Sequence, residues 1–393
     1  MRVLHLTTEF PPVIYGGLGT AVGGWVTGSS RSGLTVGVLL VEGPLGDPEA
    51  QSTTYGDVRA KRERVDGAVE RDGVTFFQAS SADAVQAGLE AVRRWRPDII
   101  HLHTAMILHV AAAIRAHTST PLVYHVHSVD RAEYELGHEP NQWLAQAVEQ
   151  GNAIRSADRL IAISESEREL LNLYYPDDRD RVRVVGNGIE DTADARHSST
   201  KPRATPSPLV LYSGRLVERK GIHELLGAIP EVLSTEPRAR FVLAGGPPFM
   251  EPADVERQWL PPELAPHRGQ IHFTGWLAPS QVDSWYSAAD VLVVPSRYEP
   301  FGMVVLEGML HSLPIVACAI GGPAEILRNE HTALLVPPRN PRALARALVR
   351  LIKDVPTRVR IGAAAASEVR RRWTWPQRVQ RMQAVYRELT AAA

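Results

Sequence analysis

The sequence contains a single cysteine, Cys318, so neither an internal disulfide nor a metal cluster held by cysteines can form. Cys318 follows the apolar residues 315–317, which predicts a buried structural thiol. No stretch reaches the roughly 18 consecutive apolar residues that a membrane-spanning helix needs. Residues 1–6 are too short for a signal peptide and predict a first strand. These absences lead us to expect a cytoplasmic protein.

An excess of charge of either sign is also absent. The net charge is -1, with 44% hydrophobic and 22% charged residues, which argues against nucleic acid or a membrane surface as the principal partner. Lysine is scarce as well, and the basic residues are nearly all arginine, as expected of a GC-rich bacterial genome. The four lysines are Lys61, Lys201, Lys220 and Lys353.

Short apolar runs alternate with helical segments along the chain, which predicts an α/β fold with two Rossmann-like domains. Residues 1–190 form one such series. Residues 191–208 are rich in Ser, Thr, Pro and charged side chains, as expected of a linker. The pattern restarts over residues 209–374. After a break at 373–376, the C-terminal segment 375–393 contains a last amphipathic helix predicted over residues 377–389.

A glycine-rich loop follows the first predicted strand. Gly16 and Gly17 precede a helix predicted over residues 18–32, an arrangement typical of a turn that approaches a phosphate. Gly17 and Gly19 lack the third glycine of the dinucleotide-binding fingerprint, so NAD binding is weakly supported. A tight turn that needs the conformational freedom of glycine is the alternative.

Histidines cluster at the ends of two predicted strands in the first half. His101 and His103 come at the end of one strand, and His125 and His127 at the end of the next. Open α/β sheets bind ligands at the carboxyl ends of their strands, so a binding role is one interpretation. The alternation of side chains along a strand places His125 and His127 on one face. Core or helix-capping histidines are the alternative.

In the second half, a buried strand over residues 291–294 leads into a turn and a helix. Unpaired amides at a helix start attract anions, and here they belong to Met303, Val304 and Val305. Glu299 and Glu307 flank this turn and could accept hydrogen bonds from sugar hydroxyls. A solvated acid pair beside an ordinary turn is the alternative.

Two cations, Arg215 and Lys220, follow the strand predicted over residues 209–212. Their position near a strand's carboxyl end suits a pyrophosphate, although two solvated charges would show the same spacing. Asp178 and Asp180 formally match an acid-x-acid metal-binding motif. They lie in a polar loop before a strand, so we assign them to the surface and expect no metal.

The segment PSRYEPFGMVVLEGMLHSLPIVACAIGGPAEIL, residues 295–327, closely resembles the donor-site signature of the retaining glycosyltransferases of family 4, relatives of glycogen and starch synthases. The likeness continues through Gly321, Gly322 and Glu325 and runs over most of the chain. It implies a GT-B fold, in which two Rossmann-like domains face a cleft and the C-terminal helix crosses back to the first domain. Glycogen synthases carry a lysine just before the Gly-Gly loop, where this chain has Tyr15, and this difference counts against that assignment.

The resemblance also implies roles for individual residues. His127 would position the C6 hydroxyl of the sugar, and Arg215 and Lys220 would hold the departing diphosphate. Glu299 would bind the sugar hydroxyls. The residues expected to contact the donor are Gly16, Gly17, Leu277, Phe301, Gly302, Met303, Val304, Val305 and Glu307, the last through the ribose. Those expected to contact the acceptor are His103, Asp130 and Glu133.

The implied reaction moves a hexosyl group from a nucleotide sugar, preferably a UDP-sugar, with retention and by a front-face mechanism. It needs no cofactor or metal. Residues 133–156 are predicted as one helical stretch. The acids of residues 130–143, which are Asp130, Glu133, Glu135 and Glu139, together with those of the polar excursion at residues 42–74, suit a polyhydroxylated or cationic acceptor such as an aminocyclitol of a natural-product pathway, an inositol or a glucan. A surface helix would explain the acids equally well.

Two other functions stay open. A nucleotide-sugar epimerase of the same architecture would need no separate acceptor. A non-catalytic partner subunit would keep the fold without the reaction.

Overall fold

The computed structural model describes residues 1–11, 14, 17–41, 68–137, 143–191, 207–247 and 250–391. Gly16, residues 42–67 of the predicted excursion and most of the predicted linker lie outside these residues. The chain divides into two compact units. The first comprises residues 1–132, 141–188 and 375–393, and the second comprises residues 133–140 and 189–374.

The first unit is built on one sheet. Its strands are β1 (Arg2–Thr7), β2 (Thr35–Val41), β3 (Ala68–Arg71), β4 (Val74–Ala79), β5 (Ile99–Leu102), β6 (Leu122–Val126), β7 (Arg159–Ala162) and β8 (Val182–Val184). The order in the sheet is β3-β4-β2-β1-β5-β6-β7-β8, and every pair is parallel except β3 with β4. Strands β3 and β4 form a hairpin over residues 68–79, with Asp72 and Gly73 in its turn at φ of 52° and 75°.

The helices of the first unit are α1 (Gly17–Arg31), α4 (Ala84–Trp95), α5 (Leu108–His117), α6 (Asp130–Gly137), α7 (Trp143–Ser156), α8 (Glu165–Tyr174) and α17 (Trp375–Thr390), with the 3-10 turns η1 (Ala105–Ile107) and η2 (Pro176–Arg181). From Glu133 onward α6 groups with the second unit. The single helical stretch predicted over residues 133–156 is wrong, because α6 ends at Gly137 and α7 begins at Trp143.

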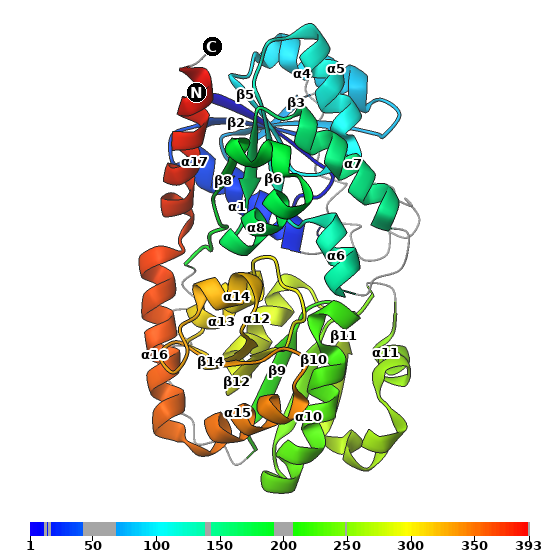
Figure 1. Ribbon diagram of the computed structural model, residues 1–393, viewed down its shortest axis with the longest axis vertical. Helices are drawn as coiled ribbons and strands as arrows, with labels where there is room; N and C mark the ends of the chain where they lie inside the picture. The colour runs from blue at the N-terminus through cyan, green and yellow to red at the C-terminus, as the bar shows by residue number, and fades with distance from the viewer. Residues whose placement is uncertain are drawn as a thin grey trace. The chain divides into compact units, whose positions relative to one another are not determined.

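The C-terminal helix α17 belongs to the first unit and lies beside α1, as the red and blue ribbons show (Figure 1). The contact is close: a Cβ on Gly24 would lie 1.9 Å from the ring of Trp375. Trp375 also meets Trp25 edge to face, with ring centroids 5.2 Å apart. The prediction that the C-terminal helix crosses back to the first domain is confirmed. The helix starts at Trp375, inside the predicted break at 373–376.

The second unit has a wholly parallel sheet. Its strands are β9 (Leu209–Ser213), β10 (Arg240–Ala244), β11 (Ile271–Gly275), β12 (Val291–Val294), β13 (Ile315–Cys318) and β14 (Leu334–Val336), in the order β11-β10-β9-β12-β13-β14. Its helices are α10 (Ile222–Thr235), α11 (Pro252–Trp259), α12 (Pro279–Ala288), α13 (Met303–Leu310), α14 (Gly321–Ile326), α15 (Pro341–Lys353) and α16 (Val355–Arg372), with the 3-10 turns η3 (Glu218–Lys220) and η4 (Pro262–Gln270).

Both sheets are explained by the sequence pattern. The central strands β5, β6, β12 and β13 are buried along their whole length, as expected of parallel strands covered by helices on both faces. Cys318 is buried at the end of β13, as predicted. None of the described helices is long and apolar enough to cross a bilayer.

Candidate functional site

The loops at the carboxyl ends of β9, β10 and β12 are packed backbone against backbone. A Cβ on Gly245 would lie 1.9 Å from the Gly214 carbonyl oxygen, and a Cβ on Gly221 would lie 1.9 Å from the Pro295 carbonyl oxygen. These three glycines have positive φ. Since no other residue fits such contacts without moving the chain, glycine here sets the spacing of the loops.

The Gly-Gly turn at the start of α14 supports the loop that carries Glu299. The Gly322 amide donates a hydrogen bond to the Glu299 carbonyl oxygen at 3.0 Å. A Cβ on Gly321 would lie 2.2 Å from that same oxygen, and one on Gly322 would lie 2.1 Å from the Phe301 carbonyl oxygen. The structure therefore supplies the reason why these glycines accompany the Pro-Phe-Gly turn.

Helix α13 starts at Met303 and is capped by Gly302, whose φ is 94°. The prediction of three free amides needs correction, because the Val305 amide donates to the Gly302 carbonyl oxygen at 2.9 Å. Helix geometry leaves Met303 and Val304 without an intrahelical acceptor for their N–H groups. The helix start therefore offers two donors to an anion rather than three.

Lys220 and Glu299, which sequence analysis assigned to separate groups of the donor, form an ion pair. The Lys220 ammonium donates to Glu299 Oε2 at 2.6 Å, and the Ser296 hydroxyl donates to the same oxygen at 3.3 Å. Burial would raise the pKa of Glu299, but Lys220 and the nearby Arg219 more than offset it, so the carboxyl pKa is below its ordinary value. Glu299 is thus held as a carboxylate.

Burial lowers the pKa of Lys220 to about 8, with Arg219 and Arg215 lowering it and Glu299 raising it. Arg219 is 3% exposed and lies 3.3 Å from Glu133. Sequence analysis missed Arg219, whose only signal was its place beside Lys220. The prediction that Glu133 contacts the acceptor is not supported, because the residue is 4% exposed and its carboxylate is paired with Arg219.

Glu307, on α13, accepts a hydrogen bond from the Tyr286 hydroxyl at 2.6 Å. Burial and the neighbouring Asp283 raise the pKa of Glu307, while the hydrogen bond from Tyr286 lowers it. Tyr286 lies on α12 and is 2% exposed. Sequence analysis overlooked Tyr286 because a buried tyrosine on an amphipathic helix carries no pattern that separates it from core packing.

Other predicted donor contacts differ in accessibility. Phe301 is 4% exposed and packs edge to face on Trp373, with ring centroids 5.7 Å apart. Its side chain therefore belongs to the core, and only its backbone could contact a ligand. Leu277 follows β11 and is partly exposed. Gly17 is the first residue of α1, with open space beside it. Arg215 is exposed, and its carbonyl oxygen accepts from the Tyr212 hydroxyl at 2.7 Å.

Five histidines of the first unit form a stack, here called the histidine ladder. They come from the adjacent strands β1, β5 and β6 and the residues that follow them, and are His5, His101, His103, His125 and His127. The rings of His125 and His127 are 4.3 Å apart and 8° from parallel, which confirms that they share a face. Sequence analysis missed His5, which is separated from the others by more than 90 residues of sequence.

The ladder contains two hydrogen-bonded chains. One joins Nδ1 of His5 to Nε2 of His103 at 2.8 Å, and Nδ1 of His103 to Nε2 of His127 at 3.0 Å. The other joins Nδ1 of His125 to Nε2 of His101 at 3.2 Å, and Nδ1 of His101 to the Tyr386 hydroxyl at 2.5 Å.

Burial keeps the ladder neutral. It lowers the pKa of His5 and of His127 to about 3. Burial and then repulsion from neighbouring histidines hold the pKa of His101, His103 and His125 well below the ordinary value. These rings therefore act at neutral pH as hydrogen-bonding groups without charge.

The structure corrects the role of His103. Its side chain is 2% exposed and both ring nitrogens contact other histidines, so a direct contact with the acceptor is not supported. His127 is partly exposed, and the hydrogen bonds described for it use only Nε2. Asp130 begins α6 and is partly buried.

Two triplets of the ladder, His5 with His101 and His103, and His103 with His125 and His127, have ring nitrogens within 4.8 Å of one another. A metal ion lies in the plane of each imidazole that binds it, whereas stacked rings have parallel planes. The stacking of His125 on His127 therefore opposes their binding one ion. Hydrogen bonding is the better description of the ladder.

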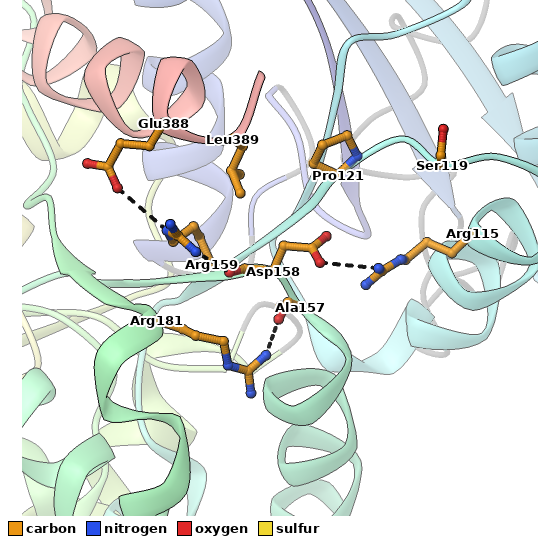
Figure 2. Close-up of a pocket in the computed structure, with 9 residues that line it drawn as sticks. All are labelled: Arg115, Ser119, Pro121, Ala157, Asp158, Arg159, Arg181, Glu388 and Leu389. Carbon is orange, nitrogen blue, oxygen red and sulfur yellow. Dashed lines mark hydrogen bonds and ion pairs between the residues drawn. The ribbon is translucent and has the colours of Figure 1, made fainter. Parts of the chain in front are cut away.

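A cavity of about 340 Å³ lies at the opposite edge of the first sheet, before β6 and β7 (Figure 2). Arg115 and Arg181 line it. Arg115 donates to the carbonyl oxygen of Ser156, the last residue of α7, and Arg181 donates to that of Ala157, the next residue. Arg115 also pairs with Asp158 at 3.2 Å. Basic side chains at a helix C-terminus satisfy its unpaired carbonyls, so this cavity is explained as a helix cap.

Sequence comparison identifies relatives for nearly the whole chain. Residues 15–193 match the family described as Glycosyltransferase Family 4, and residues 207–354 match the one described as Glycosyl transferases group 1. Glycogen synthase of Mycobacterium tuberculosis H37Rv is 29% identical, with 94% of this chain and 90% of the relative aligned. The D-inositol 3-phosphate glycosyltransferase of Acidothermus cellulolyticus is 31% identical, with 75% and 68% aligned.

A solved structure shows the same architecture. HepE of Anabaena, crystallised in complex with UDP-glucose, matches with a TM-score of 0.70 at 21% identity over 98% of this chain and 99% of HepE. At this identity the likeness shows the fold alone, and it confirms the predicted GT-B class.

The resemblance drawn from the Pro-Phe-Gly turn and its glutamates is thus confirmed by independent matches in both halves of the chain. The described contacts show how the residues of that signature are held together at the carboxyl edge of the second sheet. The chain belongs to glycosyltransferase family 4 and is an enzyme that transfers a sugar.

Proposed function

We propose that this enzyme moves a hexosyl group from a nucleotide sugar, with a UDP-sugar as first choice, to a hydroxyl of a polar acceptor with retention of configuration. The observation that carries the proposal is the ion pair of Lys220 and Glu299 beside the start of α13. The pair places a cation that can bind phosphate next to an anion that can accept hydrogen bonds from hydroxyls. The UDP-glucose in the HepE crystal structure supports the choice of donor.

The second unit offers each part of such a donor a partner of suitable chemistry. The diphosphate would meet Lys220, Arg215 and the amides of Met303 and Val304, since fixed cations and a helix start both stabilise phosphate. The described hydrogen bonds to Glu299 end on Oε2, which leaves Oε1 to accept from a sugar hydroxyl. Glu307, supported by Tyr286, would accept from the ribose hydroxyls.

The proposed reaction is a front-face displacement. The bond between the anomeric carbon and the phosphate oxygen breaks, and the acceptor oxygen bonds to the same face of that carbon. The acceptor's proton passes to the departing phosphate oxygen, so no enzyme carboxylate is needed as a nucleophile. We assign to His127 the positioning of the C6 hydroxyl, as a neutral imidazole.

The proposal is tested by incubating the enzyme with UDP-, ADP- and GDP-glucose and a panel of acceptors, followed by mass spectrometry. The names of the two relatives make a glucan and an inositol phosphate the first acceptors to try, with an aminocyclitol third. We expect a glycosylated product and nucleotide release that depends on the acceptor. Interconversion of sugars without any acceptor would instead identify an epimerase.

Removal of Glu307 should weaken nucleotide binding. A hydrogen bond to a charged group is worth about 1.5–3 kcal/mol, so Glu307→Ala should raise the Kd for UDP at least about tenfold. Tyr286→Phe removes only the supporting hydroxyl and should cost less. Calorimetry measures both affinities. An unchanged affinity in Glu307→Ala would show that Glu307 does not bind the ribose.

The two stacked histidines at the end of β6 should differ in function. His127→Ala should lower kcat while UDP binding persists, because the contact is made with the reacting sugar. His125→Ala should lower the free energy of unfolding, because that side chain is wholly buried. If kinetics and chemical denaturation gave the opposite pattern, the positioning role would belong to His125.

Transfer should not require a divalent metal, because fixed cations take over the neutralisation of the diphosphate. Activity should survive excess EDTA. Arg215→Ala and Lys220→Ala should each cost more than about a hundredfold in kcat/KM, since one electrostatic donor at a departing group is worth about 2.7–4 kcal/mol. Lys353→Ala, an exposed lysine, is the matched control. Loss of activity in EDTA and recovery with magnesium would contradict the proposal.

Nucleotide affinity should depend on pH through Lys220. Its pKa is about 8, so the ammonium is present below this pH and is lost above it. UDP should therefore bind less tightly above pH 8, and binding there should take up a proton because the diphosphate favours the charged form. Calorimetry in buffers of different ionisation enthalpy measures this uptake. Lys220→Arg, whose side chain stays charged, should abolish it.

A further inference from the structure

The chain from His5 through His103 to His127 has a direction that can be deduced by counting protons. Three neutral imidazoles carry three ring protons, and the two hydrogen bonds between them use two. The third proton must sit at one end of the chain, on Nε2 of His5 or on Nδ1 of His127.

The two ends differ in their surroundings. Nε2 of His5 is buried and has no hydrogen-bond partner among the described residues, and His5 is 0% exposed. His127 is partly exposed. An orphaned N–H in a protein interior is rarer than an acceptor without a partner, so the third proton belongs at the exposed end.

We propose that His103, supported by His5, fixes His127 in the tautomer that carries its proton on Nδ1, so that His127 presents an N–H donor to a substrate oxygen. His103 is then a positioning residue, which acts through His127 and does not touch the substrate. Each member donates toward the exposed end: His5 Nδ1–H to His103 Nε2, and His103 Nδ1–H to His127 Nε2. The contact of His127 with the sugar rests on the proposed function, but the tautomer does not.

The direction has a chemical consequence for recognition. A lone pair on Nδ1 would require the substrate to donate, whereas an N–H requires it only to accept. The hydrogen-bonded chain of histidines therefore makes His127 a donor to an oxygen with a free lone pair. The proton of that substrate hydroxyl can then be donated to another partner. The burial of His5 and His103 keeps this arrangement from exchanging with water.

Nitrogen-15 NMR of histidine-labelled enzyme without substrate tests the tautomer directly, because protonated and unprotonated ring nitrogens resonate far apart. The signals of His127 are assigned by their loss in His127→Ala. We expect Nδ1 of His127 to be protonated and Nε2 to be unprotonated. The reverse pattern would overturn the proposal, whatever the activity of the enzyme.

Two substitutions at His103 separate positioning from packing. In His103→Asn the side-chain amide nitrogen occupies the place of Nδ1 and can still donate to His127, so the tautomer and kcat should be retained within about threefold. In His103→Leu no donor is left, so the protonated Nδ1 signal should diminish, and kcat should fall about three- to tenfold with UDP affinity unchanged, the effect of one neutral hydrogen bond. Equal tautomer populations in the two variants would overturn the proposal.

Tyr386→Phe provides the matched control. It breaks a hydrogen bond of the other chain, to Nδ1 of His101, at an equally buried position. It should lower the free energy of unfolding and leave the His127 signals in place. If neither His103 variant folds, the spectrum of the unsubstituted enzyme still decides the question. A protonated Nδ1 in an enzyme without transferase activity would refute the proposed function and leave the tautomer assignment standing.

Discussion

The candidate site of the second unit depends on backbone contacts that only glycine permits. Gly221 follows Lys220 and packs against the Pro295 carbonyl oxygen, at a distance where any Cβ would overlap it. The Arg219 carbonyl oxygen accepts from the Arg297 amide at 2.8 Å, which ties the same two loops together. These contacts fix the distance between the strands' connecting loops. The 2.6 Å approach of Lys220 to Glu299 follows from them.

The buried polar groups of the two candidate sites differ in charge. In the second unit, Glu299 remains ionised because Lys220 and Arg219 compensate its burial. In the first unit, burial keeps the five histidines neutral, and hydrogen bonds among themselves replace the missing solvent. Charge suits a site for a diphosphate, whereas neutral imidazoles suit hydrogen bonds to uncharged hydroxyls.

The sequence predicts the strands well because parallel strands are continuous apolar runs, and β12 has the predicted bounds, residues 291–294. It predicts the contacts of the site less well. The Lys220–Glu299 pair joins residues 79 apart, and the His5–His103 bond joins residues 98 apart, so neither leaves a local pattern. The loss of the Val305 amide to an internal hydrogen bond is likewise a detail of one turn that composition does not specify.

Under the proposed function, the ion pair would also link recognition of the sugar to the departure of the phosphate. If Lys220 turns from Glu299 to the diphosphate, the carboxylate of this 6% exposed residue loses its nearest cation and keeps only Ser296 and the more distant Arg219. Breaking a buried ion pair costs up to about 3–5 kcal/mol. Hydrogen bonds from two sugar hydroxyls offset much of this cost. A nucleotide without its sugar supplies the anion for Lys220 but no donor for Glu299. On this argument an intact nucleotide sugar satisfies both members of the pair at once, and neither the nucleotide nor the sugar does so alone.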